Sequence, residues 1–476
     1  MTQASNIIGG QEVGASQSLE VFSPSRPDEV VGRIPHSQPK DIEAAVAAAE
    51  AAQRPWRNMG LMGRGQLLFS ASAIVEAHVD ELAELASREM GKPIGEAKGE
   101  AQRAAAILRY FGGEGAHAIG EVIPAANPGT LQYTTREPLG VVGIITPWNF
   151  PLAIPMWKVA PALLYGNTVV LKPAELSSLT AYRLCALIQG VFAPGVLNLV
   201  IGSGGKIGPA LVQHPAVRGI SFTGSTRVGR DIAHQATERG IKYQLEMGGK
   251  NPVIVAEDAD LDRAVELTVS GAMRSAGQKC TATSRVIVLG SIHKAFCDAL
   301  TQRVRQLVVG DPLSANTYVG PVVSAAQQQQ VLRFIENARQ AGYPVAVGGD
   351  RLDRAGYFVR PTIFDAVDPN SELAQEEIFG PVIAMVAASN LDEAVEIANG
   401  VRYGLSASVF TQSLKTALRV VNDLEVGMVR VNEETAGVEY QAPFGGVKES
   451  SSHSREQGRA AIEFYTETKT VAIRPM

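Results

Sequence analysis

A chain of 476 residues is about two to four times the size of a usual domain, so the sequence predicts two or more units with separate hydrophobic cores. Hydrophobic residues make up 45% of the chain and charged residues 19%, which is ordinary for a soluble globular protein. The net charge is −5 and both signs are scattered along the chain, which argues against a nucleic-acid partner.

The three cysteines, Cys185, Cys280 and Cys297, lie far apart in the chain. Their odd number and wide spacing argue against a disulfide framework and indicate free thiols in a reducing compartment. Residues 1–6 lack a basic start followed by an apolar core, and no apolar run approaches the roughly eighteen residues needed to span a bilayer. We therefore expect a cytoplasmic location and no membrane partner.

The first part of the chain is predicted to be helical. Residues 41–55 form an Ala-rich run that begins at an aspartate and ends near an Arg-Pro pair. Residues 64–90 and 95–111 continue with apolar positions at three- and four-residue spacing, separated by the helix-breaking run 91–93. These patterns predict packed helices on the surface of the first unit.

From residue 139 onward, short apolar strands alternate with helices. The run 139–146 is rich in β-branched residues without polar alternation, which is typical of a strand buried on both faces of a parallel sheet. The further strands predicted here are 168–171, 196–200 and 219–222, and the helices between them are 152–164, 178–192 and 205–213. This βαβα alternation predicts a doubly wound sheet.

The same alternation starts again after residue 246 and predicts a second α/β unit. Its predicted strands are 252–255 and 284–289, and its predicted helices are 260–275, 292–307 and 324–341. The unit is expected to end near 427–432, after which Gly-rich and polar segments lead to a short strand at 465–471. The predicted fold class is therefore α/β with two doubly wound domains.

Cys280 stands among small and polar residues, and Glu246 precedes it in the same unit. A thiolate is the strongest side-chain nucleophile near neutral pH, and a carboxylate can activate the water that releases a covalent thioester. Taken singly, such residues are ordinary: Cys185 and Cys297 are expected to be inert buried residues, and Glu246 would be a surface charge. Acyl-type chemistry is the hypothesis that the pair raises.

Seven segments, in order along nearly the whole chain, resemble the aldehyde dehydrogenase superfamily. They are TPWNFP (146–151), KPAE (172–175), FTGS (222–225), EMGGKNP (246–252), GQKCT (277–281), EEIFGPV (376–382) and PFGGVK (443–448). The resemblance implies a Rossmann-variant cofactor domain, a catalytic domain and a small oligomerisation sheet. The implied boundaries are 1–115 and 137–245 for the NAD(P)-binding domain, 246–432 for the catalytic domain, and 116–136 with 452–476 for the oligomerisation segment. A homodimer or homotetramer is implied as well.

The chemistry of aldehyde oxidation gives three residues a role. Attack of the Cys280 thiolate on an aldehyde yields a thiohemiacetal, whose oxyanion needs donors such as the Asn149 amide and the Cys280 backbone N–H. Although an asparagine before Phe-Pro is usually a turn residue, its occurrence together with Cys280 and Glu246 favours a catalytic role. Loss of hydride to nicotinamide leaves a thioester, and Glu246 would act as general base for the water that hydrolyses it.

The dinucleotide fingerprint GxGxxG is not found after the strand 141–146. Instead, the run 224–229 follows a predicted strand and opens a helix, so its N–H groups and the Ser225 hydroxyl can meet a pyrophosphate, although Gly-Ser also makes ordinary helix caps. The resemblance implies that Lys172 and Glu175 contact the adenosine ribose. A carboxylate there favours NAD over NADP because it would repel a 2′-phosphate, but Lys172 could compensate.

The resemblance also implies the remaining cofactor contacts. Glu377 and Phe379 would hold the nicotinamide half. The other residues carried over from the family pattern are Ile145, Thr146, Pro147, Trp148, Ala174, Gly205, Phe222, Gly224 and Gly248. No metal site is predicted, because His453 has no partner at metal-ligand spacing among the other histidines and is expected in a substrate loop or at the surface.

Substrate choice is expected to depend on residues near the nucleophile. Arg274, six positions before Cys280, is a reasonable partner for a carboxylate on the substrate, although a structural salt bridge or helix cap is the alternative. Semialdehyde-oxidising relatives often carry an arginine there. A second arginine of succinic semialdehyde dehydrogenases is replaced by Trp157, which is expected near the substrate tunnel with Phe150 and Phe444.

The run 449–458 departs from the family pattern, which has glycines where Ser451 and His453 stand. In this it is similar to bacterial enzymes related to α-ketoglutaric semialdehyde (2,5-dioxopentanoate) dehydrogenase. We therefore expect NAD(P)+-dependent oxidation of an acidic semialdehyde. The alternatives are a broad-specificity or betaine-type enzyme, a coenzyme A-acylating relative, against which Glu246 argues, and a catalytically inactive relative.

Overall fold

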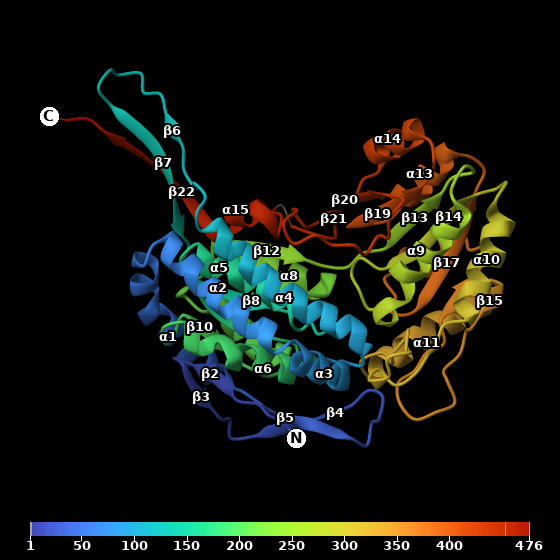
Figure 1. Ribbon diagram of the computed structural model, residues 1–476, viewed down its shortest axis with the longest axis horizontal. Coiled ribbons are helices and arrows are strands. Elements are labelled where there is room, and N and C mark those ends of the chain that lie inside the picture. Colours follow the sequence, from blue (N-terminus) through green and yellow to red (C-terminus); the bar gives the residue numbers. More distant parts are fainter. Residues whose placement is uncertain (1, 453, 476) are drawn as a thin grey trace.

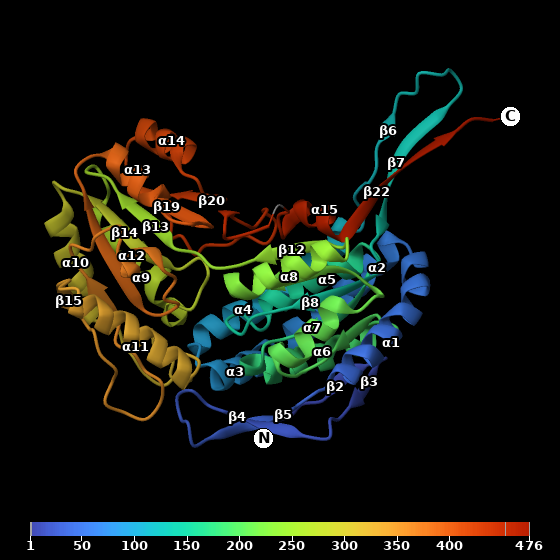
Figure 2. The same ribbon diagram turned by 180° about the vertical axis from the view of Figure 1, so that it is seen from behind.

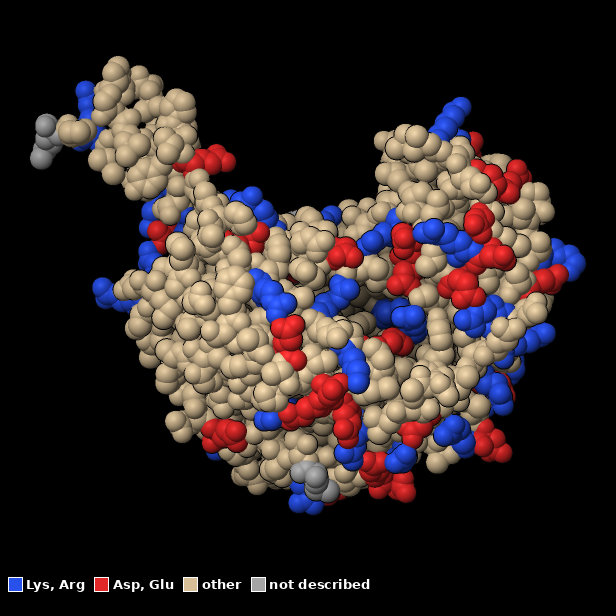
Figure 3. All heavy atoms as spheres, in the orientation of Figure 1, with Lys and Arg blue, Asp and Glu red and all other residues tan. Residues whose placement is uncertain are grey.

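The computed structural model describes residues 2–452 and 454–475. It has two lobes, each built around a seven-stranded sheet, and a narrow sheet that projects from the first lobe (Figures 1 and 2). In the described part of the chain, no helix has the length and apolar character to cross a membrane. Lys and Arg side chains are interspersed with Asp and Glu over the face shown in Figure 3. His453 lies outside the described residues.

The sheet of the first lobe contains five parallel strands and a short antiparallel extension. In spatial order the strands are β12 (Lys242–Glu246), β11 (Val217–Thr223), β8 (Val141–Ile145), β9 (Thr168–Lys172), β10 (Leu197–Leu199), β2 (Asn6–Ile8) and β3 (Gln11–Val13). The strands predicted between 139 and 222 are confirmed. The sequence did not indicate β2 and β3, because they lie outside the βαβα alternation that revealed the equally short β10, and three residues alone carry too little pattern.

Helices cover both faces of this sheet. They are α1 (Pro39–Asn58), α2 (Leu61–Ala77), α3 (Val79–Met90), α4 (Ile94–Glu114), α5 (Ala153–Leu164), α6 (Ser178–Ile188), α7 (Gly204–Gln213) and α8 (Thr226–Glu238). The prediction of one helix over 64–90 is wrong. His78 has a non-helical backbone, and its ring nitrogen lies 2.8 Å from the Ile74 carbonyl, so the chain ends α2 and begins α3 there.

The second lobe repeats the arrangement with six parallel strands and one antiparallel edge strand. In order they are β15 (Val345–Val347), β16 (Thr362–Phe364), β17 (Val382–Ala388), β14 (Thr283–Leu289), β13 (Asn251–Val255), β19 (Ser406–Phe410) and β20 (Met428–Val431). Its helices are α9 (Leu261–Met273), α10 (His293–Arg305), α11 (Ala325–Gln340), α12 (Glu372–Gln375), α13 (Leu391–Asn399) and α14 (Leu414–Asp423). The central strands are largely buried on both faces; the apolar runs predicted β13 and β14 among them, but not β17 or β19.

Three small sheets complete the fold. One combines β1 (Thr2–Gln3), β5 (Val30–Pro35) and β4 (Ser18–Phe22), and a second pairs β18 (Tyr403–Gly404) with β21 (Val447–Lys448). The third is the projecting sheet of β22 (Thr466–Ile473), β7 (Leu131–Pro138) and β6 (Val122–Ile123), preceded by the short helix α15 (Ala461–Tyr465). The strand predicted at 465–471 is therefore present, and it pairs with the segment that the sequence assigned to the same sheet.

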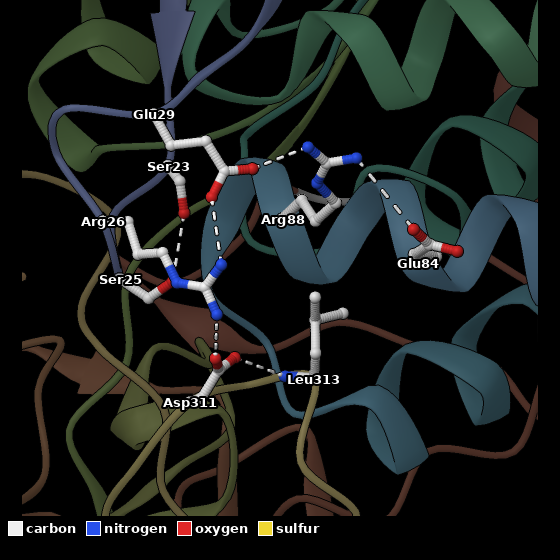
Figure 4. Close-up of polar contacts among 8 residues, drawn as sticks. All are labelled: Ser23, Ser25, Arg26, Glu29, Glu84, Arg88, Asp311 and Leu313. Carbon is white, nitrogen blue, oxygen red and sulfur yellow. Dashed lines mark hydrogen bonds and ion pairs between the residues drawn. The ribbon is translucent and has the colours of Figure 1, made fainter. Parts of the chain in front are cut away.

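The two lobes touch along the edge near α3 and α4. Arg26 forms ion pairs with Glu29 and, at 2.6 Å, with Asp311 of the second lobe, and Arg88 of α3 also contacts Glu29 (Figure 4). Close by, a Cβ added to Gly320 would lie 2.0 Å from the Gly91 carbonyl oxygen. Two backbones packed so closely leave little room for sliding, so this edge fixes how the lobes face each other.

Candidate active site

Cys280 is presented by a strained turn between α9 and β14. Ser275 and Ala276 have φ angles of 55° and 52°, in the left-handed region that side chains other than glycine seldom adopt. The Glu96 carboxylate of α4 accepts hydrogen bonds from the Ser275 N–H and hydroxyl, at 3.1 and 2.7 Å. A residue of the first lobe therefore holds the turn that carries the nucleophile of the second.

The thiol of Cys280 is surrounded by carboxylates. Burial raises the pKa of the thiol to about 12, and the negative charges of Glu377 and Glu246 act in the same direction. The backbone N–H groups of Thr281 and Cys280 partly oppose this effect. At neutral pH the free protein therefore holds mostly the thiol, and a positive charge nearby would favour the reactive thiolate.

Asn149 lies on the loop between β8 and α5 and is buried. Its side-chain N–H donates to the Gln278 carbonyl at 3.0 Å, two residues before Cys280. This bond orients the amide toward the nucleophile's turn and leaves the second N–H of the amide for another acceptor. The structure thus brings together Asn149 and Cys280, which the sequence paired as oxyanion donors.

Glu246 is the last residue of β12, and its side chain is buried. Burial raises the pKa of this carboxyl well above its usual range, and the nearby Glu456 adds to the effect. A hydrogen bond from Ser451 and the charges of Lys158 and Arg455 oppose the shift. A carboxyl held in this state is suited to take a proton from water near neutral pH.

The sequence did not single out Lys158 or Glu456, which form a buried ion pair beside Glu246. The Lys158 ammonium also donates to the Ser221 hydroxyl at 3.0 Å. A usable signal was present, because Lys158 is the one charged residue in the apolar helix α5. A lysine in such a run requires a buried partner.

A cavity of about 310 Å³ opens onto Cys280. All four residues predicted to contact substrate line it: Phe150, Trp157, Arg274 and Phe444. The Trp157 and Phe444 rings lie 5.4 Å apart and form an aromatic wall. Sequence reasoning missed several charged residues of the lining, which are Glu96, Glu100, Arg103, Lys279 and Glu434.

The charged side chains that line this cavity differ in whether they have partners within the protein. Glu100 pairs with Lys92, and Glu96 is held by Ser275, so both carboxylates already have partners. Arg274 lies with its guanidinium 5.7 Å above the Tyr318 ring and is solvent-exposed. Lys279 is buried, and burial lowers the pKa of its ammonium. The lining thus holds Arg103, Arg274 and Lys279 beside Glu96, Glu100 and Glu434, and the exposed Arg274 can meet an anionic group there.

A second cavity, of about 340 Å³, lies between the end of β8 and the helices α7 and α8. Its lining includes the predicted residues Ile145, Lys172 and Gly205. A Cβ at Gly205 would meet nothing within 4 Å, so a side chain there would fill the cavity. The pKa of Lys172 is lowered to about 8 by burial, which the charge of Glu175 partly opposes.

The start of α8 is only partly available to a phosphate. The Gly224 N–H donates to the Glu246 carbonyl at 3.0 Å, so this one N–H of the run 224–229 is engaged within the protein. Ser225 caps the helix by accepting from the Val228 N–H, which leaves its hydroxyl hydrogen free to donate. Gly224 is still required, because a Cβ there would lie 2.6 Å from the Phe222 ring.

The residues predicted for the nicotinamide half gather between the lobes. The Trp148 and Phe379 rings are 5.3 Å apart, and Phe379 has a strained φ of 56°. Burial raises the pKa of Glu377 to about 7, and its carboxylate accepts from the Gly249 N–H at 3.1 Å. A Cβ at Gly248 would lie 2.6 Å from the same carboxylate.

Residues 146–148 and Ala174 lie on loops that follow β8 and β9. The Thr146 hydroxyl is buried and has no hydrogen-bond partner among the described residues. Pro147 follows it and leads to Trp148, while Ala174 caps the turn that presents Glu175. A cavity lined by glycines, an unpaired buried hydroxyl and a partly available helix start fit a bound dinucleotide.

These features define a class: a two-lobed α/β protein with a cysteine thiol at one cavity, a buried carboxyl near that thiol and a second cavity at the end of β8. The chain belongs to the aldehyde dehydrogenase family, whose model matches residues 12–471. It is 48% identical to an α-ketoglutaric semialdehyde dehydrogenase of Bacillus subtilis over 99% of this chain and 98% of that protein. It is 38% identical to a 2,5-dioxopentanoate dehydrogenase of Saccharolobus solfataricus over 96% of each.

Solved structures agree with this assignment. A betaine aldehyde dehydrogenase of Staphylococcus aureus in complex with NAD+ superposes with a TM-score of 0.96 at 34% identity, covering 98% of this chain and 94% of that one. An NAD-dependent aldehyde dehydrogenase of Sinorhizobium meliloti gives 0.97 at 36% identity, covering 100% and 96%. The predicted fold class is therefore confirmed. The domain boundaries predicted from the sequence stay a prediction.

The carboxylates around Cys280 predict how its reactivity depends on charge. Glu377→Gln removes one negative charge, lowers the pKa of the thiol and should raise the rate of iodoacetamide alkylation of Cys280 at pH 8, by up to about tenfold for one pKa unit. Peptide mass spectrometry separates Cys280 from Cys185 and Cys297. Glu376→Gln, which removes the neighbouring surface carboxylate, is the control and should leave the rate unchanged. Equal rates in all three proteins would contradict the electrostatic account.

Proposed function

We propose that this protein oxidises an acidic semialdehyde, with 2,5-dioxopentanoate as the leading substrate, to the corresponding carboxylate with NAD(P)+. The observation that carries the proposal is one cavity whose lining contains both Cys280 and the exposed cation Arg274. Relatives named for α-ketoglutaric semialdehyde and for 2,5-dioxopentanoate support the same substrate.

The first half of the reaction uses Cys280 and Asn149. The thiolate sulfur forms a bond to the aldehyde carbon, and the carbonyl oxygen becomes an oxyanion. The free N–H of Asn149 and the Cys280 backbone N–H would donate to that oxygen. Bound NAD(P)+ supplies an acceptor for the hydride that leaves the carbon. Cys280 is then held as a thioester at the oxidation level of the acid.

The second half uses Glu246. Its ionised carboxylate takes a proton from water, the hydroxide oxygen bonds to the thioester carbon, and the carbon–sulfur bond breaks to return the Cys280 thiolate. The products are the carboxylic acid and a protonated Glu246, which releases its proton before the next cycle. A buried base of this kind favours hydrolysis over transfer of the acyl group to coenzyme A.

We propose NAD+ as the preferred cofactor. The residues that would hold it are Lys172 and Glu175 at the ribose, Ser225 at the pyrophosphate and Glu377 with Phe379 at the nicotinamide. The carboxylate of Glu175 can accept from both ribose hydroxyls and repels a 2′-phosphate. The Lys172 ammonium is the group that would accommodate NADP+. NAD-bound and NAD-dependent structural relatives support this preference.

The charge of the substrate cavity separates acidic from cationic substrates. Arg274 and Lys279 face it, whereas the carboxylates of Glu96 and Glu100 are engaged within the protein. A trimethylammonium group, as in betaine aldehyde, would meet these two cations, and Glu434 is the carboxylate of the lining that could match it. Phe150, Trp157 and Phe444 provide apolar contact for the carbon chain between the two ends of a semialdehyde.

We also propose that the protein forms a homodimer or homotetramer through the projecting sheet. Apolar side chains are exposed on its strands, with Val122 at 77%, Leu131 at 50% and Ile473 at 49% of their surface. The edge strand β22 presents backbone groups that a second copy can pair with. Sedimentation velocity should show an oligomer at micromolar concentration, and deletion of residues 466–476 should shift it to monomer. A monomeric full chain would contradict the proposal.

The three cysteines of the protein are free, and Cys185 and Cys297 are buried. Free thiols fit a reducing compartment. This supports the proposal of a cytoplasmic location.

A steady-state comparison of substrates tests the proposed activity. With NAD+, kcat/KM should be highest for 2,5-dioxopentanoate, lower for succinic semialdehyde, and lowest for betaine aldehyde and simple aliphatic aldehydes, because Arg274 lines the cavity and can bind the second carboxylate. The same series with NADP+ should give lower kcat/KM. NADH absorbance reports the rate, and product analysis should find acid and no acyl-CoA when coenzyme A is added. A cationic substrate at the top of the series would overturn the assignment.

Arg274→Ala tests the carboxylate contact separately. Loss of a charge-assisted hydrogen bond of about 1.5–3 kcal/mol should raise KM for 2,5-dioxopentanoate about tenfold or more and leave kcat/KM for an uncharged aldehyde such as pentanal nearly unchanged. The control is Arg263→Ala, which removes an exposed arginine that contacts Glu433 and does not line the cavity. If Arg274→Ala kept the preference for acidic substrates, Arg274 would not bind the substrate carboxylate and its role would be structural.

A further inference from the structure

Ser451 stands where the family pattern has glycine, and the structure places its hydroxyl against the general base. The hydroxyl donates to Oε2 of Glu246. The Gly446 N–H in turn donates to the Ser451 oxygen at 2.6 Å. An N–H, a hydroxyl and a carboxylate thus form a continuous chain of hydrogen bonds, in which each bond polarises the next.

The backbone brings Ser451 to this position by strand-like pairing. Residues 450–452 run antiparallel to the end of β12, with Glu246 opposite Ser451. The Met247 N–H donates to the Ser450 carbonyl at 2.7 Å, and the Ser452 N–H donates to the Leu245 carbonyl at 2.9 Å. Because this pairing flanks Ser451 on both sides, the hydroxyl has a defined place beside the carboxylate.

The two oxygens of Glu246 are consequently unequal. Oε2 is held by Ser451, whereas Oε1 is buried and has no hydrogen-bond partner among the described residues. Oε1 lies against Gly445, where an added Cβ would be 2.9 Å away. The anchored oxygen fixes the rotation of the carboxylate, and the other oxygen remains for a water molecule.

We infer that Ser451 is a positioning residue that orients and stabilises the ionised Glu246 for attack of water on the Cys280 thioester. The inference rests on the hydrolytic step of the proposed function and deepens it. The hydroxyl keeps its proton throughout: Oε1 of Glu246 takes the proton from water, and Ser451 donates one hydrogen bond to Oε2 before and after that transfer.

The other charges that face Glu246 set the direction of the test. Glu456 from the C-terminal segment raises the pKa of Glu246, while Lys158 of α5 and Arg455 lower it. The Cys280 thiol also lies near enough for the charge of Glu246 to raise the pKa of the thiol. Ser451 acts with the cations, because a donor favours the charged carboxylate. Its removal should therefore raise the pKa of Glu246, and the base would become active only at higher pH.

Hydrolysis of p-nitrophenyl acetate isolates this step, because it acylates Cys280 without cofactor and leaves the same kind of thioester. Ser451→Ala and Ser451→Gly should keep the burst of p-nitrophenol and lose about tenfold in steady-state deacylation at pH 7. The acid limb of the pH profile should move up by about one unit, the shift that matches a tenfold loss. Ser451→Thr, which retains a hydroxyl, should keep the wild-type profile, and Glu246→Gln should set the floor.

Ser452→Ala is the matched control. Its hydroxyl accepts from the Leu245 N–H in the same strand pairing, but it does not touch the carboxylate, so its pH profile should match that of the wild type. The inference is overturned if both Ser451 variants deacylate with the wild-type rate and profile, or if Ser452→Ala shows the same shift. An enzyme that hydrolyses the ester but reduces no NAD+ with any aldehyde would contradict the proposed function and leave the role of Ser451 standing.

Discussion

The buried carboxylate of Glu246 constrains the rest of this structure. An ionised carboxylate away from water is costly unless charges and donors surround it. Here those groups come from distant parts of the chain: Lys158 from a helix of the first lobe, and Ser451 and Arg455 from the segment that follows the second lobe's sheet. Without the return of the chain from the second lobe, Glu246 would keep Lys158 but lose Ser451 and Arg455.

The turn that carries Cys280 also depends on contacts from another part of the chain. Its turn contains Ser275 and Ala276 in left-handed conformations, which cost roughly 1–3 kcal/mol each and persist only where surrounding contacts maintain them. Glu96 supplies such contacts from the first lobe. The lobe edge around Gly91, Gly320 and the Arg26–Asp311 ion pair keeps Glu96 in reach of that turn. Nucleophile and base are each stabilised by residues of the lobe or segment across from them.

The sequence predicted those parts whose signal is local. Buried parallel strands such as β13 and β14 appear as uninterrupted apolar runs. Cys280, Glu246 and Asn149 each lie in a contiguous motif of the family. The sequence did not predict β2, the longer strands β17 and β19, or the break at His78, whose ring nitrogen lies 2.8 Å from the Ile74 carbonyl.

The sequence also did not predict contacts between residues that lie far apart in the chain. The pairing of Ser451 with Glu246 joins residues 205 positions apart, and no periodicity encodes its register. The departure from glycine at 451 was visible in the sequence, but its contact with the base was not. Lys158 is an intermediate case, since its place in an apolar helix shows that it is paired without showing that Glu456 is the partner.

The electrostatics of the site connect substrate choice to the order of chemical events. Glu377 and Glu246 disfavour the Cys280 thiolate, so the resting thiol is protected from reaction. An anionic substrate adds a further negative charge to the same cavity, which would disfavour the thiolate more if nothing offset it. Arg274 and Lys279 belong to the same cavity lining. In the proposed function, the cations that receive an acidic aldehyde would also offset its charge beside the nucleophile, which would tie specificity to reactivity at one site.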